Sequence, residues 1–212
     1  MKVLLPLLMI MILTYSCKKG QSSSKSDTTE EANINVVEVD KKSKQLEKNV
    51  YKTATGKSIE LIIDKKGSSL SDFTIVSHDF PNSTDSLHIN DSDPLWAVAI
   101  EDLDANGYDE IYLVTKSVGS GSYSSVFGFA SNQDLSLTSI YLPDISENDI
   151  QPDGKYFGYM GHDSIYFKNN KMHRKYPVYK EGDPNCCPTG GDKTLSYSLK
   201  AGEATWKLEI DN

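Results

Sequence analysis

The sequence lacks the motifs that the commonest enzyme classes require. It contains no Gly-x-Ser-x-Gly nucleophile elbow, no phosphate-binding loop and no cysteine or histidine spacing typical of zinc sites. Its four histidines are scattered through polar or strand-like surroundings, where structural roles are commoner than ligation: His78, His88, His162 and His173. Cysteine is also scarce, and the adjacent pair Cys186-Cys187 does not resemble a nucleophile with its base. We therefore expect no enzyme and no required cofactor.

Basic residues are fewer than acidic ones. Lys and Arg together number 22 against 30 Asp and Glu, which gives a formal net charge of −8 and a pI near 5.0. Phosphate binding needs a basic face, so this balance argues against a nucleic-acid partner. It permits a basic protein partner attracted by electrostatic steering, and it is equally consistent with acidity that only maintains solubility. Hydrophobic residues make up 38% of the chain, a low share that predicts an unpacked segment.

The N-terminus carries a short apolar run behind a positive start. Lys2 precedes the uncharged run Val3–Tyr15, which is shorter than the about 20 residues of a membrane span and fits a signal peptide. Ser16-Cys17 follows at once, and here the sequence resembles a bacterial lipoprotein signal of the Bacteroidetes type, although Thr14 stands where such signals usually have Leu. The resemblance implies that Cys17 is acylated and anchors the chain in the bacterial envelope, on the periplasmic side of the outer membrane or at the cell surface. A cleaved secretory signal with an incidental cysteine is the alternative.

Three segments follow from this pattern. Residues 1–16 are the predicted signal peptide, residues 17–48 the acylated cysteine with a flexible tether, and residues 49–212 the folded domain. The tether is predicted because Lys18–Ala32 is rich in Ser, Thr, Lys and Glu and has no apolar period. Ile34–Val39, within the tether, has the composition of an early strand.

The folded domain shows strand patterns and no long helical period. Apolar and polar residues alternate in short runs such as Leu195–Leu199 and Trp206–Ile210, and Asn169-Asn170 predicts a tight hairpin turn. Leu95–Ile100 is apolar on both faces and is predicted to be the central, doubly covered strand. Asp79–Asp93 is rich in Asn, Ser, Asp and Pro and is predicted to be a loop. These patterns predict an all-β fold, an antiparallel β-sandwich of about eight to ten short strands.

Oxygen-bearing side chains recur at alternate positions after the predicted central strand. They are Asp102, Asp104, Asn106 and Glu110, with Gly107 where the chain must bend. Hard cations such as Ca²⁺ prefer this kind of ligand set. An EF-hand needs a Glu at the twelfth loop position, where this chain has Leu113, so the turn is more similar to the shorter calcium loops between strands of β-propellers. Asp, Asn and Gly also favour a plain tight turn, and the sequence leaves both interpretations open.

A second turn, Ser117–Ser122, is built from Ser and Gly around a single Val and leads into Tyr123. Gly119 and Gly121 let the backbone turn tightly and approach another surface. The hydroxyl groups of Ser120 and Ser122, and a rigid Tyr ring with a polar tip, are suited to an interface. Because loops on rigid strands carry function, this turn is a candidate contact surface. A plain β-turn with a core Tyr is the alternative.

The tetrapeptide Ser120-Gly121-Ser122-Tyr123 resembles the Ser-Gly-x-Tyr signature of the periplasmic inhibitors of invertebrate-type (i-type) lysozyme. The resemblance extends over about Leu95–Ile210 and includes DLDANGYDEIYLVTKSVGSGSY, YPVYKEGDPN, PTGG and GEATWKLEI. It implies a β-sandwich whose loop enters the lysozyme cleft, where the hydroxyls of Ser120 and Tyr123 and backbone N–H groups near Gly121 bond the catalytic carboxyl groups. By this resemblance the protein binds an i-type lysozyme and protects peptidoglycan from host defence.

Two features are not part of this resemblance. The lipid anchor is not needed by a soluble inhibitor and implies a fixed position in the envelope. Cys186 and Cys187 are adjacent, with Cα atoms about 3.8 Å apart, below the usual disulfide range. In an oxidising envelope the pair forms a vicinal disulfide, a bridge to another chain or free thiols, and we weakly favour the first. A surface-anchored, Ca²⁺-dependent binding or adhesion module based on the carboxylate turn is the rival function, and a homodimer is left open.

Overall fold

A computed structural model of the chain describes residues 46–82 and 86–211. These residues belong to one structural unit, Lys41–Asn212, and form twelve β-strands and one short helical turn. The prediction of an all-β, antiparallel fold is confirmed. The strands are more numerous than the about eight to ten expected. The predicted signal peptide, Cys17 and the early strand Ile34–Val39 lie outside the described residues.

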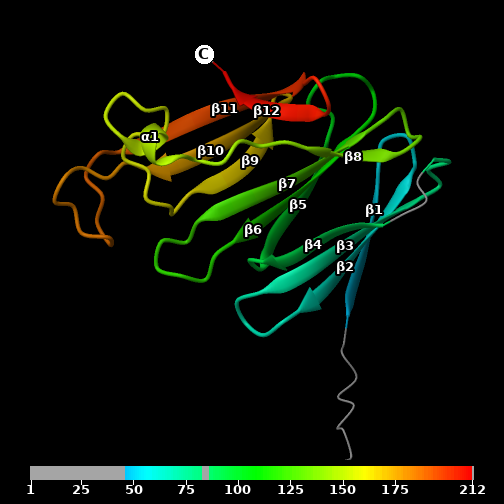
Figure 1. The fold of residues 1–212 in the computed structure, drawn as a ribbon, viewed down its shortest axis with the longest axis horizontal. Coiled ribbons are helices and arrows are strands. Elements are labelled where there is room, and N and C mark those ends of the chain that lie inside the picture. The colour runs from blue at the N-terminus through cyan, green and yellow to red at the C-terminus, as the bar shows by residue number, and fades with distance from the viewer. Residues whose placement is uncertain (1–45, 83–85, 212) are drawn as a thin grey trace, which may run out of the picture. The chain divides into compact units, whose positions relative to one another are not determined.

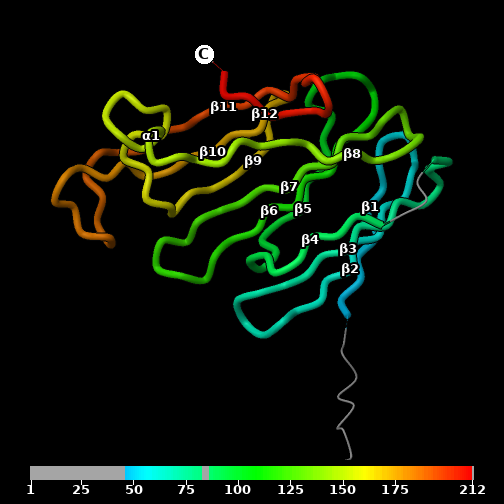
Figure 2. Tube along the Cα trace, viewed as in Figure 1, coloured from blue at the N-terminus to red at the C-terminus, as the bar shows by residue number. Residues whose placement is uncertain are grey.

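The strands form three antiparallel sheets of four strands each (Figures 1 and 2). The first sheet contains β1 (Glu47–Lys52), β2 (Ser58–Lys65), β3 (Ser71–His78) and β4 (Leu87–Ser92). The second contains β5 (Leu95–Glu101), β6 (Glu110–Lys116), β7 (Ser124–Ser131) and β8 (Leu137–Ile140). The third contains β9 (Ser164–Lys168), β10 (Lys171–Pro177), β11 (Asp192–Ala201) and β12 (Trp206–Ile210). In every sheet the strands pair in chain order, so short turns suffice to connect them.

The second sheet is the middle layer and packs a hydrophobic core on each face (Figure 1). The core shared with the third sheet contains Tyr112, Val114, Val126, Met172, Tyr176, Tyr197 and Leu208. The core shared with the first sheet contains Ile59, Leu61, Phe73, Ile75, Ile111, Leu113 and Phe129. Successive residues of β6 therefore point into different cores, as the alternation of side chains along a strand requires.

The doubly covered strand is β6, so the prediction that Leu95–Ile100 would be central is wrong. All side chains from Glu110 to Thr115 are buried, whereas Trp96 in β5 is 70% exposed. β5 is an edge strand of its sheet and pairs with β6 alone. An apolar run shows that a strand tolerates burial, but coverage of both faces depends on the layers packed above and below it.

Two strands arise where the sequence predicted none. Leu87–Ser92, inside the predicted loop Asp79–Asp93, forms β4 and pairs with β3. β4 is an edge strand whose side chains are mostly exposed, so it lacks the apolar signal of a buried strand. β1 begins at Glu47, just inside the segment predicted as tether.

The helical turn α1 (Glu147–Ile150) is capped by Ser146 and Asp149, which form a capping box.

The predicted hairpin at Asn169-Asn170 is confirmed. β9 and β10 pair in antiparallel register up to Lys168 and Lys171, and the two Asn residues between them have φ angles of 53° and 56°. Two consecutive left-handed residues are what a tight hairpin turn needs, and Asn tolerates that conformation better than most residues.

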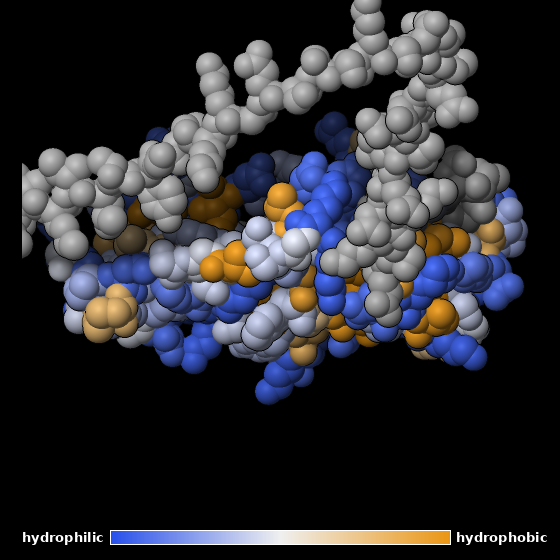
Figure 3. Space-filling model, turned by 90° about the horizontal axis from the view of Figure 1, so that it is seen from below, coloured by the Kyte–Doolittle hydropathy of each residue, from blue (hydrophilic) through white to orange (hydrophobic). Residues whose placement is uncertain are grey.

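On the face shown in Figure 3, hydrophilic and hydrophobic residues are interspersed. Among the described residues, no helix has the length and apolar character needed to cross a membrane.

Candidate functional site

The Ser- and Gly-rich turn joins β6 to β7 at one end of the middle sheet, and we call Ser117–Tyr123 the contact loop (Figure 1). Two hydrogen bonds close its base: the Ser117 N–H donates to the Tyr123 carbonyl oxygen at 2.9 Å, and the Tyr123 N–H donates to Ser117 Oγ at 2.9 Å. Inside the loop the Ser122 N–H donates to the Gly119 carbonyl oxygen at 3.0 Å. Ser122 has a φ of 47°, a left-handed conformation that a non-glycine residue keeps only where its surroundings impose it.

Two other segments bind the backbone of the contact loop from outside. The His162 N–H donates to the Gly121 carbonyl oxygen at 2.7 Å. Gly161, with a φ of 87°, lies so close that a Cβ atom there would stand 2.1 Å from the same oxygen. The side-chain amide of Asn185 donates to the Ser120 carbonyl oxygen at 3.4 Å. These contacts fix the path of the loop from two sides.

Tyr123 is held in place while its ring remains accessible. The side chain is 46% exposed. Its ring lies over Gly121, where a Cβ atom would come within 2.3 Å of a ring carbon, and it meets Tyr159 edge-on at a centroid distance of 5.8 Å. Within the described residues the hydroxyl groups of Ser120, Ser122 and Tyr123 have no hydrogen-bond partner. The predicted contact residues thus present three hydroxyl groups that are free to bond a partner.

A buried ion pair lies beneath the two ends of the contact loop. Arg174 Nη1 in β10 lies 2.5 Å from Asp163 Oδ2, and both side chains are buried. Asp163 Oδ1 accepts the Ser124 N–H at 2.9 Å, its carbonyl oxygen accepts Lys116 Nζ at 3.0 Å, and Arg174 Nη1 donates to the Ser124 carbonyl oxygen at 3.1 Å. Lys116 ends β6 and Ser124 begins β7, so this pair sets the spacing of the strands that carry the loop.

Four buried tyrosines surround this ion pair: Tyr156, Tyr159, Tyr176 and Tyr197. The Tyr159 hydroxyl accepts from Arg174 Nη1 at 3.2 Å, and the Arg174 guanidinium lies 5.8 Å from the centre of the Tyr159 ring. The hydroxyls of Tyr156 and Tyr197 are hydrogen-bonded to each other. Burial raises the pKa of Tyr176 to about 12, so this side chain stays neutral at physiological pH. The cluster forms a rigid base on which the exposed Tyr123 ring rests.

A groove of about 800 Å³ opens beside Tyr123. Its lining includes most of β7, the segment 141–147 and part of β4. Tyr159 and Arg174 contribute to its lining, so the groove connects the buried ion pair with the exposed ring. A recess next to an exposed aromatic side chain enlarges the surface that can bind a partner.

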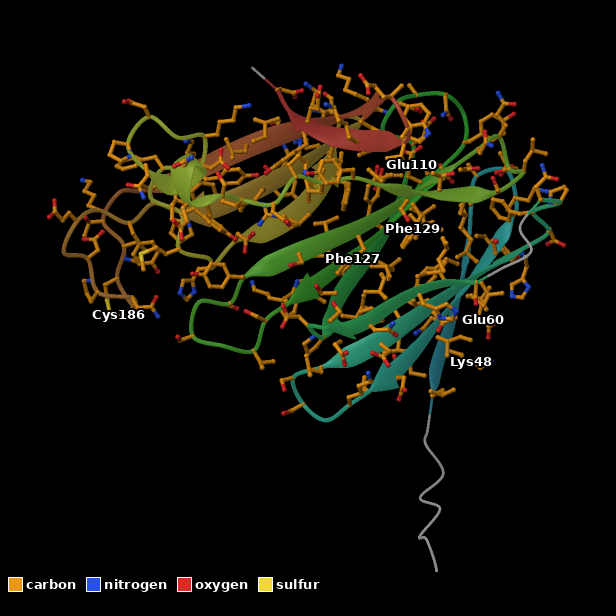
Figure 4. All side chains as sticks on the ribbon, in the orientation of Figure 1. Lys48, Glu60, Glu110, Phe127, Phe129 and Cys186 are labelled. Carbon is orange, nitrogen blue, oxygen red and sulfur yellow. A yellow bond between two sulfur atoms is a disulfide. The ribbon has the colours of Figure 1, made fainter. Side chains whose placement is uncertain are left out.

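The structure joins Cys186 and Cys187 in a disulfide, with Cα atoms 3.8 Å apart, which is the first of the three alternatives raised by the sequence. The pair lies at an exposed loop tip, directly after the Asn185 that holds Ser120 (Figure 4). The Asn185 carbonyl oxygen also accepts the Tyr179 hydroxyl at 2.8 Å. The disulfide therefore belongs to the segment that positions the contact loop.

The predicted metal ligands of the carboxylate turn are brought together. Asp102, Asp104 and Glu110 each offer a carboxylate oxygen, and these oxygens lie within 4.8 Å of one another. The Asn106 side-chain amide lies beside them and donates to Asp104 Oδ2 at 3.0 Å. Burial, together with the nearby Asp104, Asp102 and Asp109 carboxylates, raises the pKa of Glu110 to about 8.

The residues that support the contact loop have weak or no signals in the local sequence. Arg174 had a usable signal, because it occupies the inward position between the buried Met172 and Tyr176 of an alternating strand. Gly161 and His162 carry no local signal, since their role depends on a contact with a residue about 40 positions earlier in the chain. The other three histidines have ordinary structural partners: His78 with Glu60, His88 with Thr74, and His173 with Ser196.

Comparison of the chain with known protein families, with curated proteins and with solved structures finds no match.

Proposed function

We propose that this protein inhibits i-type lysozyme and that it binds the enzyme through the contact loop. The observation that carries the proposal is an exposed loop, held by backbone hydrogen bonds at its base and from two neighbouring segments, that presents three hydroxyl groups with no partner among the described residues, at Ser120, Ser122 and Tyr123. The resemblance of Ser120-Gly121-Ser122-Tyr123 to the inhibitor signature points to the same residues. An exposed Tyr that packs on a glycine is suited to contact, because the ring is already ordered before a partner arrives.

Rigidity supports an inhibitor rather than a flexible binding segment. Ordering one side chain at an interface costs about 0.5–1.5 kcal/mol, and ordering a free loop costs more. The contact loop avoids much of this cost, because His162 and Asn185 donate hydrogen bonds to two of its carbonyl groups before binding, and Gly161 permits the close approach. A protein that blocks an active site needs shape and hydrogen-bond donors, and it needs no catalytic group of its own.

The chemistry of the lysozyme cleft matches the groups that the loop presents. Lysozymes cleave glycans with two carboxyl groups that flank the sugar. Hydroxyl donors of Ser120 and Tyr123 can bond such carboxylates in short, charge-assisted contacts of about 2.5–2.7 Å. The Tyr123 ring would occupy a sugar subsite, while the net charge of −8 favours approach to a basic enzyme.

The proposed setting is the bacterial envelope, with acylated Cys17 as the anchor. A variant without the anchor tests membrane attachment independently of inhibition. A Cys17→Ala chain should be released from the membrane after export and should still inhibit the lysozyme. A Cys17→Ala chain that stays membrane-bound would argue against the lipid anchor and would leave the inhibitor proposal unaffected.

Inhibition assays with three classes of lysozyme test the proposal. The purified full chain should inhibit an i-type lysozyme at nanomolar concentration and should inhibit chicken-type and goose-type enzymes at least about 100-fold more weakly. A chitooligosaccharide that fills the cleft should compete with the protein, because both would occupy the same subsites. Failure to inhibit any of the three enzymes, together with Ca²⁺-dependent binding to glycans or cells, would favour the rival adhesion module.

A further inference from the structure

The carboxylate turn lies at the opposite end of β6 from the contact loop. It joins β5 to β6 and begins directly after Glu101. Asp102 shapes the turn, because its two carboxylate oxygens accept the N–H groups of Asn106 at 3.0 Å and Gly107 at 2.9 Å. Glu110, the first residue of β6, completes the group from beneath the turn (Figure 4).

Glu110 has a buried oxygen that the protein itself does not satisfy. Its side chain is fully buried, and Oε2 accepts the Leu103 N–H at 2.8 Å. Oε1 has no hydrogen-bond partner within the described part of the chain, and the Glu110 carboxylate belongs to the cluster with Asp102 and Asp104. Buried polar atoms are almost always paired, so an unpaired oxygen on a buried carboxylate that clusters with two others points to a cation as its partner.

The chemical type of the ligand atoms indicates which kind of metal ion the cluster would bind. The cluster offers only oxygen donors, with no cysteine or histidine among them, and hard divalent cations prefer such sites. Ca²⁺ takes about six to eight oxygens in flexible geometry, so three carboxylates leave places for backbone carbonyls and water. The Asn106 side chain supports the cluster from outside, because its amide N–H donates to Asp104 Oδ2 while its Oδ1 accepts the Tyr108 N–H. We propose that the carboxylates of Asp102, Asp104 and Glu110 bind a Ca²⁺ ion.

The proposed ion would brace the junction of the three sheets. The Asn170 side chain, in the turn between β9 and β10, donates to the Asp102 carbonyl oxygen at 2.6 Å. The Ala54 N–H, in the turn between β1 and β2, donates to Asp109 Oδ2 at 2.5 Å. The carboxylate turn thus bonds to the first and third sheets while it belongs to the second. Because it lies away from the contact loop, its role is in stability and not in lysozyme contact.

Calorimetric titration and thermal unfolding of the full chain, purified in detergent, test this site without any lysozyme. Ca²⁺ should bind with measurable heat and should raise the melting temperature by about 5–10 °C when its concentration exceeds the dissociation constant about 100-fold. Mg²⁺ at the same concentration should shift the melting temperature much less. No heat and no shift with Ca²⁺, or an equal shift with Mg²⁺, would overturn the calcium assignment.

Matched variants locate the site. Asp104→Asn should abolish the Ca²⁺-dependent shift, because it removes a ligand charge and keeps the shape of the side chain. Asn106→Ala is a second variant that leaves no buried group unpaired, since Asn106 is exposed, and it should weaken Ca²⁺ binding less than Asp104→Asn does, because it removes only the amide that donates to Asp104. Glu101→Gln is the control, because Glu101 is exposed and lies opposite Glu110 in the strand register without joining the cluster. A shift retained in Asp104→Asn, or lost equally in Glu101→Gln, would contradict the site.

Discussion

The main-chain N–H of His162 donates a 2.7 Å hydrogen bond to the carbonyl oxygen of Gly121, and Gly161 is the residue that makes this approach possible. A side chain at position 161 would collide with the same oxygen, at 2.1 Å from its Cβ atom. The position of the contact loop therefore depends on a glycine in another segment. A substitution at Gly161 can therefore change the position of the contact loop without altering its exposed side chains.

Replacing Gly161 with Ala should displace the contact loop and weaken lysozyme binding at least about 10-fold, or about 1.4 kcal/mol. The inhibition constant measures this effect. Gly67→Ala is the matched control, because Gly67 also has a positive φ, 93°, but a Cβ atom there would meet nothing within 4 Å. Both variants should lose stability from backbone strain, and Gly161→Ala should lose more, because its Cβ atom would also meet the backbone of Gly121. Equal inhibition constants for the two variants would argue against a positioning role for Gly161.

Removing the Tyr123 ring should cost more than removing its hydroxyl group. Tyr123→Ala should weaken inhibition about 30-fold or more, in the range of an interface hot spot, while Tyr123→Phe should lose about 2- to 10-fold for a single hydrogen bond. Neither variant should change the melting temperature much, because the side chain is 46% exposed. Tyr166→Ala is the control, since Tyr166 is 40% exposed but lies on β9. A loss with Tyr166→Ala as large as with Tyr123→Ala would contradict a specific contact at the loop.

Breaking the buried ion pair should destabilise the fold. Arg174→Met leaves the buried Asp163 carboxylate without its partner and should lower the free energy of unfolding by about 3–5 kcal/mol. Urea unfolding measures this change. The neighbouring Lys175→Met breaks only the exposed pair with Asp192 and should cost less than about 1 kcal/mol. If both variants unfold at the same urea concentration, the Arg174–Asp163 pair does not hold the base of the loop.

The vicinal disulfide predicts the number of reactive thiols in the loop between β10 and β11. When the unreduced chain is denatured and treated with an alkylating reagent, the peptide that contains Cys186 and Cys187 should gain no label. After reduction the same peptide should gain two labels, as mass spectrometry would show. Labelling before reduction would indicate free thiols, and a disulfide-linked pair of chains would indicate an intermolecular bridge.

The regular parts of the fold were predictable because strand periodicity is a local signal. Alternation identified β2, β11 and β12, and two Asn residues identified the hairpin between β9 and β10. The central strand was not predictable in this way. β6 contains Glu110, Tyr112 and Thr115, whose polar side chains would predict exposure. All three are buried, because sheets cover both faces of β6. Which strand becomes central depends on how layers stack, and that is not a property of one segment.

The exposed residues of the candidate site could be predicted from the sequence. The residues that hold the contact loop in place could not. Ser120 and Tyr123 stand out because of the Gly-spaced hydroxyl pattern, and the structure places them on an exposed turn. The contacts that hold this turn come from Gly161, Asp163 and Arg174, which lie tens of residues away and meet only in the folded chain. A local pattern can suggest what a loop offers, whereas its rigidity depends on long-range packing.

The central claim is that Ser120 and Tyr123 make the decisive contacts with an i-type lysozyme. Its most direct test is a titration of that enzyme's activity with the wild-type full chain and with the Ser120→Ala/Tyr123→Ala variant. We predict nanomolar inhibition by the wild type, inhibition weaker by about 100-fold or more in the variant, and melting temperatures that agree within about 2 °C. Full inhibition by the double variant, or no inhibition by the wild type, would contradict the claim.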